Sequence, residues 1–129
     1  MLRTWTGVQE YLRKQYTLEH DNSDMISMVW AYEDGRSQKV LLRKYSVDSR
    51  EMLEVKSPFA RREQGSPEEL LCMNSELPLA TIALSADVYL VVYNAILENL
   101  GAEDLEWILG RVAAIADALE AKLGVGDEF

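Results

Sequence analysis

The fold of this chain is decided by residues 66–123, which read SPEELLCMNSELPLATIALSADVYLVVYNAILENLGAEDLEWILGRVAAIADALEAKL. Ser66 is a preferred N-cap residue and Pro67 a preferred first helical residue, so the stretch opens with a short capped helix. Two short apolar runs, residues 79–84 and 88–93, flank a polar turn and predict a hairpin of two strands. Everything upstream is expected to pack against this unit.

The last part of the stretch predicts a long helix that begins near Gly101 and ends at Gly124. Glu103 and Asp104 fall in its first turn, where the helix dipole favours anions. Its apolar residues recur at spacings of three and four and therefore share one face: Leu105, Ile108, Leu109, Val112, Ile115, Ala116, Leu119 and Leu123. Burying that face contributes about 12–24 kcal/mol before conformational entropy is subtracted, so packing stabilises this helix far more than its end charges do.

The first half of the chain predicts one helix and three strands. Residues 6–16 predict the helix, with Thr6 at the start of a capping-box spacing. The polar residues 19–24, which include His20, predict a loop. Apolar or alternating runs predict a meander of three strands at residues 25–32, 38–45 and 52–57. Pro58 is expected to end the third strand, because proline cannot donate to a strand ladder.

Together these elements predict an α+β fold in the order helix, three strands, helix, two strands, helix. The hairpin connections make the five-stranded sheet mostly antiparallel, with the helices gathered on one of its faces. At 129 residues the chain fits one domain. We expect this domain to cover residues 1–124 and residues 125–129 to form a mobile C-terminal tail.

The composition disfavours several classes of function. A net charge of −9 argues against nucleic acid and anionic membrane as partners, because both need a cationic face. No apolar run approaches a membrane span and no signal-peptide pattern is present, so we expect a cytoplasmic protein. The single histidine, His20, and the single cysteine, Cys72, supply neither a metal-ligand set nor a nucleophile with a base. We therefore expect no catalytic residue, metal or cofactor, and Cys72 to be a buried small apolar residue.

The first predicted strand is unusual because it is apolar on both alternating sets of side chains. One set is Ile26, Met28, Trp30 and Tyr32, and the other is Met25, Val29 and Ala31. Helices on one face cannot cover both sides of a sheet, so the uncovered side is expected to carry an apolar patch. Either long neighbouring side chains shield it, or it forms a dimer or partner surface. The candidate residues for that surface are Met25, Met28, Trp30, Tyr32 and Leu41.

Two segments of the chain resemble a known family: residues 33–40, EDGRSQKV, and residues 74–80, NSELPLA. With the hairpin and the alanine-rich helix that follow, they resemble the YbjN-like family of bacterial sensory transduction regulators. That family is similar in fold to the class I type III secretion chaperones. The resemblance covers residues 8–123 and implies an acidic cytoplasmic protein, commonly a homodimer, that binds polypeptides or acts in regulation without catalysis. In the chaperones the partner chain wraps in extended form over apolar patches.

The resemblance and the apolar first strand predict a non-enzymatic protein-binding module, chaperone-like or adaptor-like, that binds a polypeptide partner through apolar sheet surface. The alternative is a regulatory or sensory signalling protein of the same fold that recognises a small ligand or a signalling partner. A thermal-shift screen separates the two, because a ligand at about 100 times its dissociation constant adds about 2.7 kcal/mol of stability.

Overall fold

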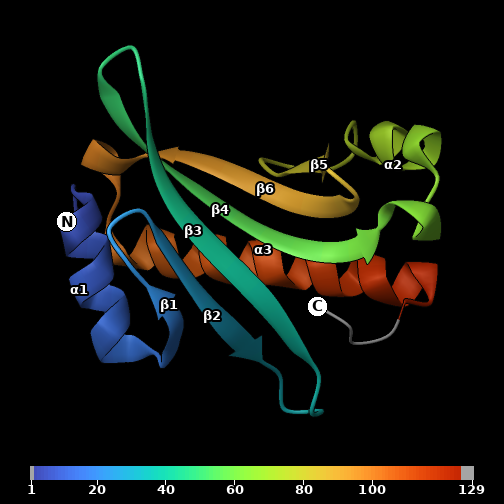
Figure 1. Cartoon of the computed structure of the whole chain (residues 1–129), viewed down its shortest axis with the longest axis horizontal. Helices are drawn as coiled ribbons and strands as arrows, with labels where there is room; N and C mark the ends of the chain where they lie inside the picture. Colours follow the sequence, from blue (N-terminus) through green and yellow to red (C-terminus); the bar gives the residue numbers. More distant parts are fainter. Residues whose placement is uncertain (1, 126–129) are drawn as a thin grey trace.

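In the computed structural model, which describes residues 2–125, a long helix lies across one face of an antiparallel sheet (Figure 1). The six strands have the order β1-β2-β3-β4-β6-β5. They are β1 (Leu18–Asp21), β2 (Met25–Ala31), β3 (Ser37–Val47), β4 (Arg50–Arg61), β5 (Thr81–Ser85) and β6 (Val88–Ile96). The helices are α1 (Trp5–Gln15), α2 (Pro67–Met73) and α3 (Ala102–Leu123), with 3₁₀ turns η1 (Arg62–Gln64) and η2 (Leu97–Asn99). The predicted α+β class is confirmed.

The prediction of five strands is wrong, because residues assigned to a polar loop form the edge strand β1. This strand pairs antiparallel with β2, placing Leu18 opposite Met28 and Asp21 opposite Ile26, with a bulge between Leu18 and His20. Asp and His have low strand preference, but β2 is an apolar strand that would otherwise present an unpaired edge. The pairing partner, which lies elsewhere in the chain, therefore overrides the local preference of this segment.

Strand β4 continues through Pro58, where the prediction ended it. The register with β6 shifts between Pro58 and Ala60, which marks a β-bulge and accommodates a residue that has no N–H to donate. On the other side of the strand, the Pro58 carbonyl accepts a hydrogen bond of 2.7 Å from the buried Gln38 side chain of β3. Phe59, the residue within the bulge, and Ala60, which follows it, are both fully buried, so the strand stays in the core as it bends.

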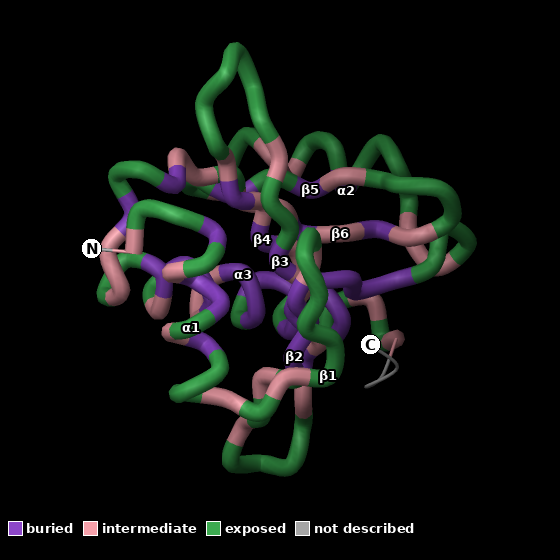
Figure 2. Tube along the Cα trace, turned by 60° about the vertical axis from the view of Figure 1, so that its left-hand side comes forward, coloured by how far each residue is buried: buried purple, intermediate pink, exposed green. Residues whose placement is uncertain are grey.

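The core lies between the sheet and the helices, and buried segments follow α3 and the central strands (Figure 2). The apolar stripe predicted for the last helix is buried, apart from the half-buried Leu123 at its end. Leu70 is the buried residue of α2. The face of α1 that enters the core carries Trp5, Val8 and Leu12. The predicted helix layer on one side of the sheet is therefore present.

The helix ends follow local chemistry closely, with one exception. Ser66 caps α2 by accepting the Glu69 N–H, and Gly124 ends α3 in the left-handed conformation with φ 69°. The predicted cap Thr6 is wrong, because Thr4 accepts the Gly7 N–H at 3.0 Å and starts α1 earlier.

The predicted C-terminal tail begins one residue too early. The Val125 N–H bonds to the Glu120 carbonyl at 3.0 Å, and the Val125 side chain packs against the core. This arrangement is the usual continuation of a helix that ends in a left-handed glycine. Residues 126–129, the rest of the predicted tail, lie outside the described residues.

Gly110 is a glycine in the interior of α3, beside the Trp30 ring. A Cβ built on it would lie 3.7 Å from Trp30 Cζ2, which is ordinary van der Waals contact. We expect Gly110→Ala to raise the free energy of unfolding by about 0.5–1 kcal/mol, because alanine loses less backbone freedom in a helix. Urea unfolding followed by circular dichroism measures the change, and a loss of stability would show that Trp30 cannot accept the methyl group.

Candidate functional site

The sheet has a face covered by helices and a face on which none of the described helices packs. Strand register assigns residues to these faces, because paired positions point to the same side. One row that faces away from α3 runs across five strands as Ser27, Leu41, Lys56, Val92 and Thr81. We call this side the open face. Its members in the described chain include Met25, Ser27, Val29, Lys39, Leu41, Arg43, Tyr45, Val47, Met52, Glu54, Lys56, Leu90, Val92, Asn94, Ile96, Thr81 and Ala83.

The open face is largely apolar, but its apolar side chains are only partly buried. Val29 is 46% exposed and Val47 is 48% exposed, which is high for valine in a strand. Other apolar side chains on this face are half-buried: Met25, Leu41, Tyr45, Met52, Leu90, Val92 and Ile96. A contiguous surface of this kind is typical of a contact surface for another molecule.

A charged cluster lies at the centre of the open face. Glu54 accepts hydrogen bonds from Arg43 Nε at 3.1 Å and from Arg43 Nη2 at 3.3 Å, and Lys56 Nζ lies 3.1 Å from Glu54 Oε1. The Arg43 guanidinium also lies 4.9 Å from the centre of the Tyr45 ring. Burial alone would raise the pKa of the Glu54 carboxyl, but the hydrogen bonds from Arg43 and Lys56 outweigh it and lower that pKa. The Glu54 carboxylate therefore pairs with both Arg43 and Lys56.

One edge of the sheet, strand β5, is blocked by a side chain. The Ile82 N–H donates to Asn74 Oδ1 at 2.6 Å, and Asn74 Nδ2 donates to the Ile82 carbonyl at 3.2 Å. In an antiparallel pair, alternate residues of an edge strand point their N–H and C=O outward. Asn74 takes up the outward pair of Ile82, the second residue of β5, so an added strand cannot bond there.

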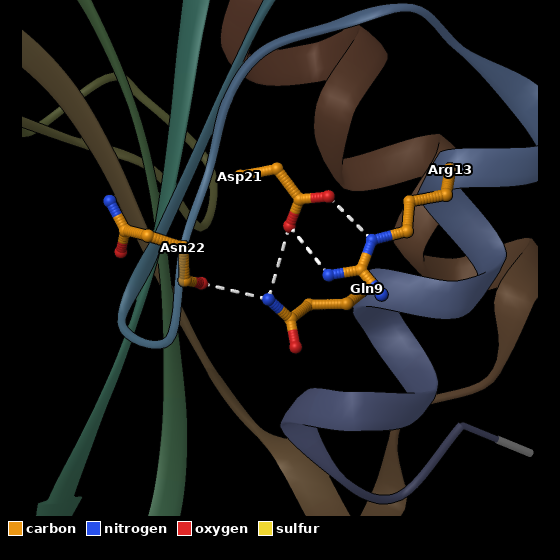
Figure 3. A network of polar contacts seen from close by, with 4 residues as sticks. All are labelled: Gln9, Arg13, Asp21 and Asn22. Atoms are coloured by element: carbon orange, nitrogen blue, oxygen red, sulfur yellow. Dashed lines mark hydrogen bonds and ion pairs between the residues drawn. The ribbon is translucent and has the colours of Figure 1, made fainter.

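The other edge, strand β1, is short and lies beside α1 (Figure 1). Figure 3 shows the polar contacts that join the two elements. Gln9 Nε2 donates to the Asn22 carbonyl at 2.8 Å and to Asp21 Oδ1 at 3.2 Å, and Arg13 pairs with the Asp21 carboxylate. The hydrogen bond from Arg13 lowers the pKa of Asp21. A bulged strand of this length with a helix alongside is a poor template for strand addition.

The structure divides the candidate residues predicted from sequence between the two faces. Met25 and Leu41 lie on the open face. Met28 is fully buried, so its assignment to a surface is wrong. Trp30 belongs to the same alternating set as Met28; it packs against the core and its ring lies 5.9 Å from that of Tyr16. Tyr32 lies just beyond the end of β2, where burial, followed by the charge of Asp117, raises its pKa.

The sequence-based prediction missed the charged residues of the open face and some of its apolar residues. Lys39, Arg43 and Lys56 alternate with Leu41 and other apolar residues along β3 and β4. That alternation was visible in the sequence, because residues two apart on a strand share a face. The prediction instead favoured residues of the first predicted strand, because both of its alternating sets of side chains are apolar.

Other chemically capable residues do not assemble into a site. Cys72, predicted to be buried, is exposed, because α2 turns only Leu70 fully into the core. Cys72 lines a groove of about 680 Å³ between α2 and the end of α3. His20 lies on β1, where its Nδ1 is 2.7 Å from Ser27 Oγ. Within residues 2–125, no group of three His, Cys, Asp or Glu side chains is placed to hold a metal ion.

These features define the class of the protein: an α+β protein whose antiparallel sheet is covered by helices on one face and presents an apolar, centrally charged surface on the other. Among the described helices, none has the length and apolar character to cross a membrane. Comparison of the chain with protein-family models and with curated proteins finds no match. The resemblance to the YbjN-like family stays a prediction.

Proposed function

We propose that the protein is a non-enzymatic polypeptide-binding module, chaperone-like or adaptor-like, and that its open face contacts the partner. The observation that carries the proposal is this face itself, with apolar side chains from β2, β3, β4 and β6 and no helix of the described chain packed over them. Each Å² of apolar surface that a partner covers contributes about 25 cal/mol, so a polypeptide segment gains by lying there.

The blocked edges support contact through side chains instead of strand addition. Asn74 occupies the outward backbone groups of Ile82, and α1 lies beside β1. A partner that added a strand would have to displace these hydrogen bonds, each with a net contribution of about 0.5–1.5 kcal/mol. A segment that lies across the open face displaces none of them. Methionine and aromatic residues such as Met25, Met52 and Tyr45 also suit contact with varied sequences.

The test is a fluorescence-anisotropy screen of the whole protein against an array of short peptides of varied composition. For the tightest peptides, we expect Leu41→Ser and Val29→Ser each to weaken binding by about tenfold, because each removes an apolar contact of about 1–2 kcal/mol. The matched control is Leu71→Ser, which removes a leucine that is 66% exposed on α2 and therefore lies on none of the strands that form the open face.

Two results would contradict the proposal. One is that no peptide binds, and the other is that Leu71→Ser weakens binding as much as Leu41→Ser does. Light scattering with and without peptide is run in parallel, because a second copy of the chain covering the open face would appear as a dimer that peptide does not dissociate. The thermal midpoint of each variant shows that it is folded.

A further inference from the structure

We infer that the polypeptide segment held by the open face is acidic as well as apolar, and that its carboxylates pair with Lys39 and Lys56. This inference rests on the proposed function and adds the chemical class of the partner. It starts from how charge is distributed over the two faces of the sheet.

The charges of this acidic protein are segregated between the two sides of the sheet. The open face carries the cations Lys39, Arg43 and Lys56 and the carboxylate of Glu54, in a protein of net charge −9. On the other side, helices α2 and α3 carry Arg111 and Lys122 against a larger group of carboxylates: Glu68, Glu69, Glu103, Asp104, Glu106, Asp117 and Glu120. The open face is thus a cationic region on an anionic molecule, and it attracts anionic segments that the rest of the surface repels.

Ion pairs within the described chain leave part of the positive charge on the open face without a carboxylate partner. Both Arg43 nitrogens that face Glu54 are engaged with it. Lys56 shares that carboxylate, which occupies one of the three donors of its ammonium group. Lys39 forms no ion pair with any described residue. Two ammonium groups are therefore available to a partner, one completely and one in part.

The positions of the two lysines alternate with apolar residues. Lys56 lies directly between Leu41 and Val92 in the sheet, and Lys39 lies opposite Val29. Lys39 and Leu41 are two residues apart on β3, so they are separated by about 7 Å on the same face. A segment in which carboxylates alternate with apolar side chains matches this arrangement.

A neutral apolar segment and nucleic acid fit the open face less well, and a second copy of the chain is tested directly. A neutral apolar segment would desolvate Lys39 without pairing it, which costs free energy. Nucleic acid would gain contacts with a few cations only, while the remaining charge of the protein repels it. A second copy of the chain would place the carboxylates of its α2 and α3 side against these lysines. Light scattering tests for such a dimer.

The experiment compares three labelled synthetic peptides with identical leucine positions and with aspartate, asparagine or lysine between them. By fluorescence anisotropy at about 0.05 M NaCl, we expect the aspartate peptide to bind at least about tenfold more tightly than the asparagine peptide. The lysine peptide should bind most weakly. Raising NaCl to about 0.5 M should remove most of the difference, because exposed ion pairs are screened.

Variants separate the charge contribution from the apolar one. The double substitution Lys39→Gln with Lys56→Gln should abolish the preference for aspartate and leave asparagine-peptide binding within about twofold. The control Lys14→Gln removes an exposed lysine of α1 and should change neither affinity. Leu41→Ser should weaken both peptides alike.

The outcomes distinguish the inference from the proposed function. If the asparagine peptide binds as tightly as the aspartate peptide, and Leu41→Ser weakens both, the inference is overturned and the proposed function stands. If Leu41→Ser changes neither affinity, the proposed function fails. If light scattering shows a dimer that the aspartate peptide does not dissociate, a second copy occupies the face and the inference is overturned.

Discussion

Leu42→Ala is expected to lower the free energy of unfolding by about 2–5 kcal/mol, whereas Leu41→Ala, one residue earlier on β3, lowers it by about 1 kcal/mol or less. Leu42 is fully buried between Ile26 and Val55, its neighbours on β2 and β4, on the face that α3 covers. Truncating it leaves a cavity. Leu41 points to the open face and is half-buried there, so water fills the space of the lost side chain.

Urea unfolding of both variants measures the difference, and the slope with denaturant shows whether the comparison stays two-state. In the peptide-binding assay, the order reverses: Leu41→Ala weakens binding, and Leu42→Ala has little effect at temperatures where it remains folded. Equal losses of stability from the two substitutions would mean that the open face is covered, and the proposed contact surface would be wrong.

Trp30→Ala is expected to lower the free energy of unfolding by about 2–4 kcal/mol, slightly less than for a completely buried tryptophan. The Trp30 ring packs against the ring of Tyr16, at 5.9 Å between centroids, and borders Gly110 of α3. Removing it takes away the contacts that this end of β2 makes with Tyr16, at the end of α1, and with α3. The sequence alone left open whether Trp30 belongs to an interface or to the core, and its position on the helix side assigns it to the core.

The matched control is Trp107→Ala, the same chemical change at a tryptophan of α3 that is 50% exposed. Its expected cost is about 1 kcal/mol or less. Thermal and urea unfolding measure stability, and light scattering measures association in the same samples. A Trp30→Ala protein that keeps its thermal midpoint but loses association would contradict this assignment and restore Trp30 to an interface.

The elements that the sequence predicted well are those with signals carried by neighbouring residues. Ser66 and Pro67 start α2, and Gly124 ends α3. The apolar residues of α3 recur at spacings of three and four and form the face that packs on the sheet. Two hairpins whose strands are joined by predicted polar turns, β2 with β3 and β5 with β6, are also present. Each of these signals acts within a few residues, so it does not depend on where the rest of the chain lies.

The candidate surface was predicted less well, for a physical reason. A strand that is apolar on both sides offers two equivalent faces, and the sequence contains nothing local that chooses between them. The docking of α3 makes the choice. It buries Met28 and leaves Val29 at 46% exposure, although the two residues are adjacent in the chain. Sequence reasoning therefore found an apolar surface but assigned it partly to the wrong set.

The sequence by itself determined the α+β class, the start of α2, the end of α3, the antiparallel hairpins and the presence of more apolar strand surface than the helices can bury. Only the tertiary structure decided that residues 18–21 pair as an edge strand, that β4 bends through Pro58, and which side of the sheet stays open. Caps and turns draw on neighbouring residues, whereas strand pairing and face selection depend on contacts between segments far apart in the chain. The free energy of those contacts outweighs local preference.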